Sequence, residues 1–473
     1  MRRTKIICTL GPKCSDKETL REMLKNGMSV ARLNFSHGDH EYHKNLIKTF
    51  RSVRDEMGIP AAVMLDTKGP EIRLGLIENG CAEIHEGDKF ILTARDIIGS
   101  SKEASITYKE LPKKLGKDSV ILIDDGKIRL QVDSCTETDI ECTVKFGGEI
   151  KDQKGLNIPY AELEMPYLNE KDKADLIFGI EQDVDYVAAS FVRSKDDIIA
   201  MRKFLDYNGG HNIKIIAKIE NIEGVRNFDD ILKAADGIMI ARGDMGVELE
   251  YYMLPGIQKK FIKKCCRAGK LVITATQMLE SMIHSATPTR AEITDVANAV
   301  FDGTSAVMLS GETAAGDHPP LVVKVMAQIV QKAEEDMFDI FGEEEKRYDN
   351  DEYDITNAIC DAACTTAKDV HATAIIAVTA SGTTALRVSK FHPHEPIIAS
   401  TPIVKTFHQL ALAWGVHPVL ALIQDNTDKL FRHAIDCAKQ IDLVTEGDRV
   451  VITAGVPLKQ AGTTNTLKVQ IVD

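Results

Sequence analysis

Eight short apolar runs recur along this chain, and most of them end abruptly in polar or charged residues. A strand that is apolar at successive positions is buried on both faces, as in a parallel sheet covered by helices. Between most of the runs lie roughly 25 to 35 residues with an amphipathic helical pattern, which is the repeat of a (β/α)8 TIM barrel. We therefore predict such a barrel. The runs are Lys5–Leu10, Val30–Asn34, Ala61–Asp66, Tyr186–Phe191, Ile215–Glu220, Ile238–Asp244, Leu271–Thr276 and Ser305–Ser310.

One interval, from Asp66 to Tyr186, is far too long for a single crossover. Glycines divide it into short alternating segments such as Ile121–Ile128 and Ile140–Phe146, which predict a small inserted β-barrel domain. Because this domain leaves the barrel after the third strand, we expect it to cover the carboxyl end as a lid that excludes water.

A second domain is predicted after the eighth run. The segment Phe341–Asp354 is acidic and nearly free of aliphatic residues, which indicates a solvated linker or helix end. Five further strand-like runs predict an open α/β sheet whose last strand is antiparallel: Ala374–Thr379, Pro396–Ser400, Val416–Ala421, Arg449–Ala454 and Leu467–Val472. The predicted domains are 1–69 and 167–341 for the barrel, 70–166 for the lid, and 342–473 for a C-terminal regulatory domain.

Composition excludes several classes of protein. The net charge of -13 argues against nucleic-acid binding, and no apolar run approaches the roughly 20 residues of a membrane-spanning helix. We expect no signal peptide, because Met1–Thr4 leads directly into the first run. The ten cysteines include no C-x-x-C pair, so reduced thiols in the cytoplasm are expected.

Two carboxylates follow neighbouring predicted strands, Glu220 after the fifth and Asp244 after the sixth. No His or Cys lies near them in sequence, which favours Mg2+ or Mn2+ over zinc. The alternative is that both carboxylates only neutralise Lys218 and Arg242.

Cationic side chains lie at the same predicted mouth. Arg32 and Arg73 offer planar forks suited to phosphate oxygens, and Lys218 adds a point charge that can follow a moving phosphoryl group. The alternative is a network of ion pairs at the rim, in which the arginines bind Asp66 and Glu71.

Uncharged donors complete the predicted site. Gly243 and Asp244 precede a predicted short helix at Met245–Glu248, where free N–H groups could hold a carboxylate or a phosphate, with Thr276 adding a hydroxyl. Oxygen donors on adjacent strands predict a monovalent-cation cage, although an ordinary hydrogen-bond network is the alternative. These donors are Asn34, Ser36, Asp66 and Thr67.

The C-terminal domain contains the sequence TASGTT between a predicted strand and a predicted helix. Hydroxyls and a glycine at the start of a helix can cradle a phosphate, and a plain helix-capping turn is the alternative. The residues concerned are Thr379, Ser381, Gly382, Thr383 and Thr384.

Over essentially its whole length, the chain resembles the pyruvate kinase family. Six ordered motifs carry the resemblance: RLNFSHG at Arg32–Gly38, LDTKGPEIR at Leu65–Arg73, KIEN at Lys218–Asn221, ARGDMG at Ala241–Gly246, ATQMLESM at Ala275–Met282, and MLSGETA at Met308–Ala314.

The resemblance implies transfer of the phosphoryl group of phosphoenolpyruvate to ADP, followed by protonation of the enolate to pyruvate. It implies Mg2+ at Glu220 and Asp244, and a catalytic Lys218. The remaining implied assignments are phosphate oxygens at Arg32 and Arg73; K+ at Asn34, Ser36, Asp66 and Thr67; the substrate carboxylate at Gly243, Asp244 and Thr276; and the nucleotide at Asn34, His37 and Arg73. Glu71 matches the residue typical of K+-dependent members. For the proton we favour a water chain beside Thr276 and Ser310.

The resemblance also implies a homotetramer and a regulatory site for a phosphorylated metabolite at the TASGTT loop, with Gly455–Thr464 as its opposite wall. Thr383 stands where members that respond to fructose bisphosphate commonly carry a basic residue, so the effector stays open.

Two other functions compete with this prediction. A barrel lyase or aldolase would use Lys218 as a Schiff-base amine, but it leaves Glu71, the cation cage and the lid unexplained. A metabolite sensor with an inert barrel is the non-enzymatic alternative, and the charges at every strand end argue against it.

Overall fold

The computed structural model describes residues 2–161, 165–341, 354–457 and 464–473. Eight parallel strands close into a barrel in the order β1-β17-β16-β15-β14-β13-β3-β2, which confirms the predicted architecture. The strands are β1 Lys5–Thr9, β2 Val30–Asn34, β3 Ala62–Asp66, β13 Tyr186–Ala189, β14 Lys214–Ile219, β15 Gly237–Ala241, β16 Leu271–Ala275 and β17 Ala306–Leu309.

Helices surround the barrel, and several start at side-chain caps that the sequence supplies. Asp16 accepts hydrogen bonds from the first turn of α1, and Ser194 and Thr289 form capping boxes at α5 and α10. The helices of this part are α1 Lys17–Lys25, α2 His40–Met57, α4 Glu170–Glu181, α5 Lys195–Tyr207, α6 Ile222–Arg226, α7 Phe228–Ala234, α8 Arg242–Glu248, α9 Leu254–Ala268, α10 Arg290–Phe301, α11 Gly311–Ala314 and α12 Pro319–Phe341.

The barrel strands are buried on both faces, as their apolar runs predict. Side chains such as Met64, Ile216 and Met239 fill the interior, while alternate residues such as Val63 and Ile240 pack against the helices. Several strands end earlier than predicted, because the polar residues that follow them leave the sheet. Ala241 ends β15, for example, and the next residue, Arg242, begins α8.

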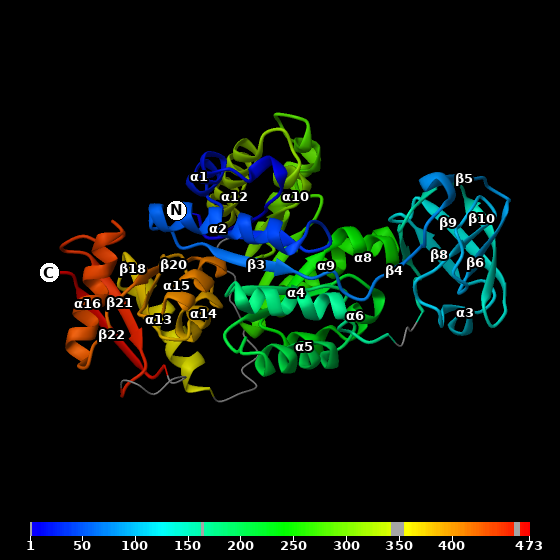
Figure 1. Ribbon diagram of the computed structural model, residues 1–473. Helices are drawn as coiled ribbons and strands as arrows, with labels where there is room; N and C mark the ends of the chain where they lie inside the picture. Colours follow the sequence, from blue (N-terminus) through cyan, green and yellow to red (C-terminus); the bar gives the residue numbers. More distant parts are fainter. Residues whose placement is uncertain (1, 162–164, 342–353, 458–463) are drawn as a thin grey trace.

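The insertion folds as an all-β domain at one end of the barrel (Figure 1). Its strands surround one apolar core. A seven-stranded sheet has the order β4-β12-β8-β9-β10-β6-β7, and β11 pairs with β5. The elements are β4 Ile72–Arg73, β5 Cys81–Ile84, β6 Lys89–Thr93, β7 Glu103–Ser105, α3 Leu111–Lys114, β8 Val120–Ile123, β9 Ile128–Cys135, β10 Asp139–Phe146, β11 Gly148–Lys151 and β12 Gly155–Asn157.

One predicted lid segment is wrong. Ile121–Ile128 is not a single strand, because β8 ends at Ile123 and β9 starts at Ile128. Asp124, Asp125 and Gly126 all have positive φ and turn the chain back between the two strands.

The C-terminal domain is the predicted open sheet, with the order β20-β19-β18-β21-β22 and only the last pair antiparallel. Its elements are α13 Ile355–Asp369, β18 Ala374–Val378, α14 Thr383–Ser389, β19 Ile397–Thr401, α15 Val404–Gln409, β20 Val416–Leu420, α16 Thr427–Gln440, β21 Arg449–Ala454 and β22 Thr466–Ile471. Most of the predicted linker Phe341–Asp354 lies outside the described residues.

The C-terminal domain packs against the amino end of the barrel, opposite the lid (Figure 1). The first residue of β1, Lys5, donates from Nζ to the carbonyl of Val416 at 2.7 Å. The first residue of β13, Tyr186, donates from its hydroxyl to the carbonyl of Gln409 at 2.6 Å. The carboxyl ends of the strands therefore remain open toward the lid. Within the described ranges, no helix combines the length and apolar character needed to cross a membrane.

Candidate active site

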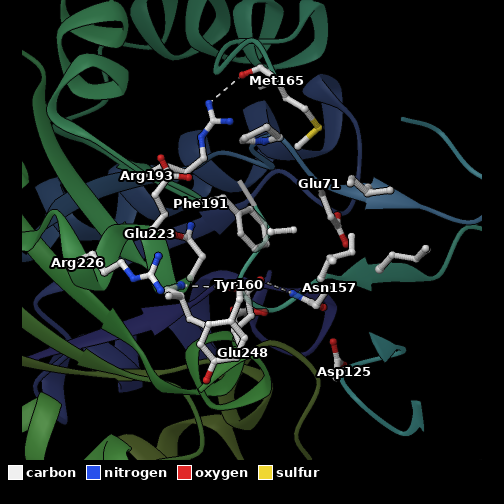
Figure 2. A pocket seen from close by; sticks show the side chains of 18 residues that line it. Glu71, Asp125, Asn157, Tyr160, Met165, Phe191, Arg193, Glu223, Arg226 and Glu248 are labelled. Carbon is white, nitrogen blue, oxygen red and sulfur yellow. Dashed lines mark hydrogen bonds between the residues drawn. The ribbon is translucent and has the colours of Figure 1, made fainter. Parts of the chain in front are cut away.

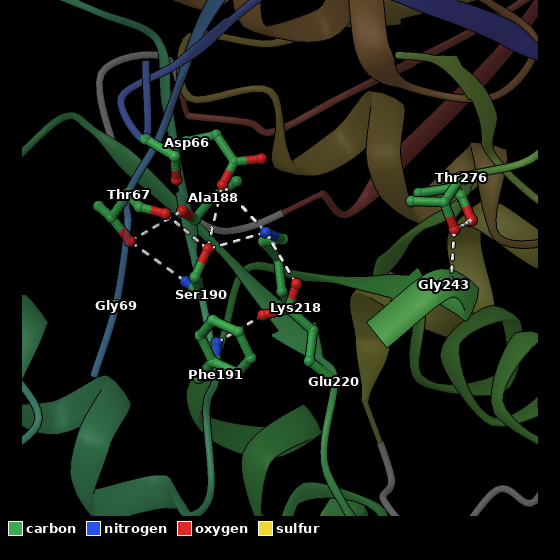
Figure 3. Close-up of polar contacts among 12 residues, drawn as sticks. Asp66, Thr67, Gly69, Ala188, Ser190, Phe191, Lys218, Glu220, Gly243 and Thr276 are labelled. Atoms are coloured by element: carbon green, nitrogen blue, oxygen red, sulfur yellow. Dashed lines mark hydrogen bonds and ion pairs between the residues drawn. The ribbon is translucent and has the colours of Figure 1, made fainter. Parts of the chain in front are cut away.

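Lys218 lies at the centre of a polar cluster at the carboxyl end of the barrel (Figure 3). Its Nζ lies 2.9 Å from Glu220 Oε1, 3.1 Å from Asp66 Oδ1 and 2.8 Å from Ser190 Oγ. Burial by itself lowers the pKa of the Lys218 ammonium, but attraction to Asp66 and Glu220 outweighs this, and the net pKa is raised. The surroundings of the buried Lys218 therefore favour its charged form.

Glu220 is held from two sides. Its Oε2 accepts a hydrogen bond from the backbone N of Phe191 at 2.6 Å, and Phe191 has a left-handed φ of 54°. Burial raises the pKa of the Glu220 carboxyl to about 7; Lys218 opposes this rise and Asp244 adds to it. The carboxylates of the buried Glu220 and the half-buried Asp244 thus repel one another, which is an arrangement that a divalent cation would relieve.

The ion pairs around these carboxylates match the ion-pair alternative at Glu220 and differ from it at Asp244. Glu220 pairs with Lys218, as the ion-pair alternative expects. Arg242 instead pairs with Asp295, with Nη1 to Oδ2 at 2.6 Å, so it is not the partner that this alternative assigns to Asp244. In the described part of the chain, no three His, Cys, Asp or Glu side chains group as metal ligands. Any divalent ion here would rely on two carboxylates and on substrate or water oxygens.

Both predicted phosphate-binding arginines have carboxylate partners. Arg32 Nε lies 2.6 Å from Asp66 Oδ2, and Arg73 Nη2 lies 2.6 Å from Glu71 Oε2. These are the pairs that the rim-network alternative expects. Burial alone raises the pKa of the Asp66 carboxyl, but Arg32 and Lys218 outweigh it and the net pKa is lowered.

The four predicted cation-cage residues follow two neighbouring strands. Asn34 and Asp66 are register partners in β2 and β3. Asn34 Oδ1 accepts from the backbone N of Ser36 at 3.1 Å, and the Thr67 hydroxyl donates to the carbonyl of Ala188 at 3.3 Å. His37 lies in the same turn, where its N donates to the carbonyl of Asn34 at 3.2 Å.

The predicted anion pocket at α8 is built differently than expected. The helix begins at Arg242 rather than Met245. The backbone N of Gly243 is not free: it donates to Thr276 Oγ1 at 2.7 Å, and this hydroxyl donates to the carbonyl of Ala275 at 2.6 Å. Ser310 follows the adjacent strand β17, and its N donates to Glu312 Oε2 at 2.6 Å. Among the described residues, no direct hydrogen bond joins Ser310 and Thr276.

Sequence reasoning missed Ser190 and the amide of Phe191, although both lie in the predicted fourth run. The Ser190 hydroxyl lies 2.6 Å from the carbonyl of Thr67 and 3.1 Å from Asp66 Oδ1, besides its contact with Lys218. It therefore connects the ends of three strands. The only signal in the sequence is that a polar residue follows a buried strand, as at the other strand ends.

A pocket between lid and barrel opens beside this cluster (Figure 2). The lid contributes Asn157 and Tyr160, and the barrel contributes Phe191, Asp244 and Glu248. Asn157 Nδ2 lies 3.4 Å from Glu248 Oε1, which joins the two domains directly. The lid thus covers one side of the site around Asp244.

The predicted effector loop connects β18 to α14, and its hydroxyls bind one another. Gly382, with a φ of 86°, donates from N to Thr379 Oγ1 at 2.9 Å, as a capping turn would. Ser381 Oγ lies 2.9 Å from Thr383 Oγ1, and Thr384 Oγ1 lies 2.8 Å from Thr464 Oγ1. Of the predicted opposite wall Gly455–Thr464, residues 458–463 lie outside the described residues.

Fold and site together define a class: a barrel enzyme with a buried lysine between carboxylates, a β lid above the site and an α/β domain at the other end. Family models for the barrel domain and the alpha/beta domain of pyruvate kinase match residues 1–323 and 357–470. The pyruvate kinase of Clostridium acetobutylicum is 46% identical over 475 residues, covering 100% of both chains. That of Staphylococcus haemolyticus is 45% identical, covering 100% of this chain and 81% of its own.

Similarity extends to a solved structure. A crystal structure of a pyruvate kinase from Cryptosporidium parvum superposes with a TM-score of 0.92 at 38% identity, covering 100% of this chain and 96% of that one. The chain belongs to the pyruvate kinase family and is a phosphotransferase.

Proposed function

We propose that the protein transfers the phosphoryl group of phosphoenolpyruvate to ADP, giving pyruvate and ATP in the final step of glycolysis. The observation that carries this proposal is the buried Lys218 in contact with Glu220 and near Asp244, at a mouth covered by the lid. Phosphoryl transfer depends on positioning and charge neutralisation more than on covalent chemistry, and this site supplies both.

Each charged side chain has a role in the proposal. The Lys218 ammonium stabilises the phosphoryl group in transit, and Arg32 and Arg73 hold its oxygens. Glu220 and Asp244 would hold Mg2+ or Mn2+, and the donor set fits because these two carboxylates repel one another. When bound, this ion neutralises anionic substrate oxygens.

Uncharged groups orient the rest of the substrates. Asn34, Ser36, Asp66 and Thr67 would hold K+ between β2 and β3. Asn34 and His37, with Arg73 of the lid, face the nucleotide. The Thr276 hydroxyl and the backbone at Gly243 and Asp244 would hold the substrate carboxylate, which must then replace the present hydrogen bond from Gly243 N to Thr276 Oγ1. Water beside Thr276 and Ser310 delivers the proton to the enolate carbon.

The C-terminal domain carries the proposed regulation. A phosphorylated small molecule would bind the hydroxyl-rich loop at Thr379, Ser381, Gly382, Thr383 and Thr384 and would displace the hydrogen bonds that now join its hydroxyls. We further propose a homotetramer in the cytoplasm. None of the ten cysteines, all of which lie in the described ranges, forms a disulfide, which suits a reducing compartment.

The lyase alternative is disfavoured by the same lysine. A Schiff base requires a neutral amine, whereas Asp66 and Glu220 raise the pKa of Lys218. Borohydride added with pyruvate is therefore expected to trap no covalent adduct.

The test is pyruvate formation from phosphoenolpyruvate and ADP with Mg2+, in K+ or in a large organic cation. Turnover that requires K+ supports the reaction and the cation cage together. Turnover that is equal with and without K+ supports the reaction and contradicts the proposed K+ site. No turnover under either condition, even with sugar phosphates or AMP added, overturns the proposed function in favour of a sensor.

A further inference from the structure

The backbone that presents the Thr276 hydroxyl is strained. Thr276 has a φ of 69° and the next residue, Gln277, has a φ of 53°. Left-handed φ values are rare outside glycine and are outliers for a β-branched residue such as threonine. Two such residues in succession persist only where surrounding contacts fix them, and such positions concentrate at functional sites.

Arg242 supplies those contacts. Its Nη2 donates to the carbonyl of Thr276 at 2.7 Å and to that of Gln277 at 3.3 Å, and its Nε donates to the carbonyl of Ala275 at 3.3 Å. One guanidinium therefore binds three successive carbonyls of the strained segment. Its planar fork has several donors in a fixed geometry, which a flexible lysine lacks.

The guanidinium is itself held from the other side. Nη1 lies 2.6 Å from Asp295 Oδ2 on α10 and 3.4 Å from Gln258 Oε1 on α9. The Arg242 side chain is 8% exposed. Both helices thus fix the guanidinium plane relative to β16. Besides the three carbonyls, the guanidinium also contacts the Met278 sulfur, through Nη2 at 2.9 Å.

We propose that Arg242 is a positioning residue for the reaction: it holds Ala275–Gln277 in the strained conformation that directs the Thr276 hydroxyl to the amide of Gly243. This inference rests on the role of Thr276 in the proposed function. Arg242 itself touches no reacting atom. Its removal should act on the steps that use Thr276, which are binding of the substrate carboxylate and protonation of the enolate.

The experiment compares Arg242→Lys, Thr276→Ala and the double variant with the unaltered enzyme. Steady-state kinetics give KM for phosphoenolpyruvate and for ADP, and the exchange of pyruvate methyl protons with D2O in the presence of ATP reports proton transfer. For Arg242→Lys we expect about a tenfold rise in KM for phosphoenolpyruvate and a similar fall in exchange rate, with KM for ADP and the Mg2+ requirement unchanged.

The double variant tests whether the two residues act as a unit. Residues that act through one another are non-additive, so the double variant should lose little more than Thr276→Ala alone. Arg202→Lys is the matched control, because Arg202 also joins a carbonyl, that of Ile213, to a carboxylate, Asp236, but before β14 and β15 begin. Thermal unfolding of each variant shows whether the fold is retained.

The outcomes separate the inference from the function on which it rests. An unaltered enzyme that forms no pyruvate overturns the proposed function. Suppose that Thr276→Ala impairs KM for phosphoenolpyruvate and proton exchange. If Arg242→Lys then leaves both unimpaired, or if the two losses simply add in the double variant, the positioning role is overturned and the function stays intact. A Thr276→Ala enzyme with normal KM and exchange removes the role of Thr276, and the inference with it. A loss in Arg202→Lys equal to that in Arg242→Lys reduces the effect to general destabilisation and also overturns the inference.

Discussion

Lys218 Nζ lies 2.9 Å from Oε1 of Glu220, two positions further along the same strand end. The other oxygen of Glu220 accepts from the backbone N of Phe191 at 2.6 Å, so both carboxylate oxygens already have a partner. A divalent cation bound by Glu220 must therefore compete with the ammonium for Oε1. Under the proposed function, an ion held by Glu220 and Asp244 would leave the Lys218 ammonium available to the phosphoryl group.

Replacing Glu220 with Gln should weaken the response to Mg2+. The amide keeps the size of the side chain but loses the charge that a hard cation requires. We expect the Mg2+ concentration for half-maximal activity to rise about tenfold or more, equivalent to ~1.4 kcal/mol. Titration of activity with Mg2+ measures it. Glu334→Gln is the control, because Glu334 is also buried but accepts from the backbone N of Arg3 and Thr4 at the amino end of the barrel. Equal losses in both variants would contradict the assignment.

Replacing Lys218 with Met should remove turnover without removing substrate binding altogether. The charge at the phosphoryl group is lost, and kcat should fall about a hundredfold or more. The change also leaves Asp66 and Glu220 without their shared cation, which costs about 3–5 kcal/mol of folding free energy. Circular dichroism must therefore show that the variant is folded at the assay temperature. Lys5→Met, which removes a buried lysine at the start of β1 and so at the amino end of the barrel, should keep its kcat. A folded Lys218→Met enzyme with normal kcat would refute the role.

Replacing His43 should raise KM for ADP more than KM for phosphoenolpyruvate, because His43 binds the backbone of His37, which faces the nucleotide in the proposed function. His43 stacks on Phe35 with ring centroids 4.1 Å apart, and its Nε2 donates to the carbonyl of His37 at 2.8 Å. His43→Phe keeps the stacking and loses the donor, whereas His43→Gln keeps a donor and loses the ring. We expect KM for ADP to rise about three- to tenfold in the Phe variant, because the loss of one hydrogen bond has an effect of about that size. The rise should be smaller in the Gln variant. Equal KM values for ADP in all three proteins would exclude a role for this bond.

Acid should weaken the contact between barrel and C-terminal domain through His408. Burial, with the nearby Arg54, Arg51 and Lys405 cations, lowers the pKa of His408 to about 4, and its buried Nδ1 has no hydrogen-bond partner. The neutral ring contributes stability above the unfolded pKa near 6.5, and this contribution is lost as pH falls toward 4, by at most about 3 kcal/mol. Between pH 7 and 4.5, the unfolding temperature should fall less steeply in His408→Gln than in the unaltered protein. The exposed His211, changed in the same way, should leave the slope unaltered, and an unchanged slope for His408→Gln would contradict the prediction.

The barrel was predictable because each buried strand is a continuous apolar run in the sequence, as in Ile238–Ala241. The sequence does not show where a strand ends. Arg242 is predicted to lie in the sixth strand but begins α8, and its side chain binds Asp295 on α10, which is distant in sequence. Ser190 carries no charge and gains its importance only where β3, β13 and β14 end together. The amide of Phe191 escapes prediction for a similar reason, because its partner, Glu220, follows a neighbouring strand. The Gly243 N–H is predicted as a free donor, and the sequence does not show that Thr276, after the next strand, accepts from it.

Arg73 lies on β4, and β4 pairs with β12 inside the lid sheet. The guanidinium of Arg73 is therefore attached to the lid, whereas Arg32 belongs to the barrel strand β2. An anion bound by both arginines, as the proposed function requires, would link the lid to the barrel. Under the proposed function, the position of the lid relative to the barrel would therefore depend on whether the phosphate is bound.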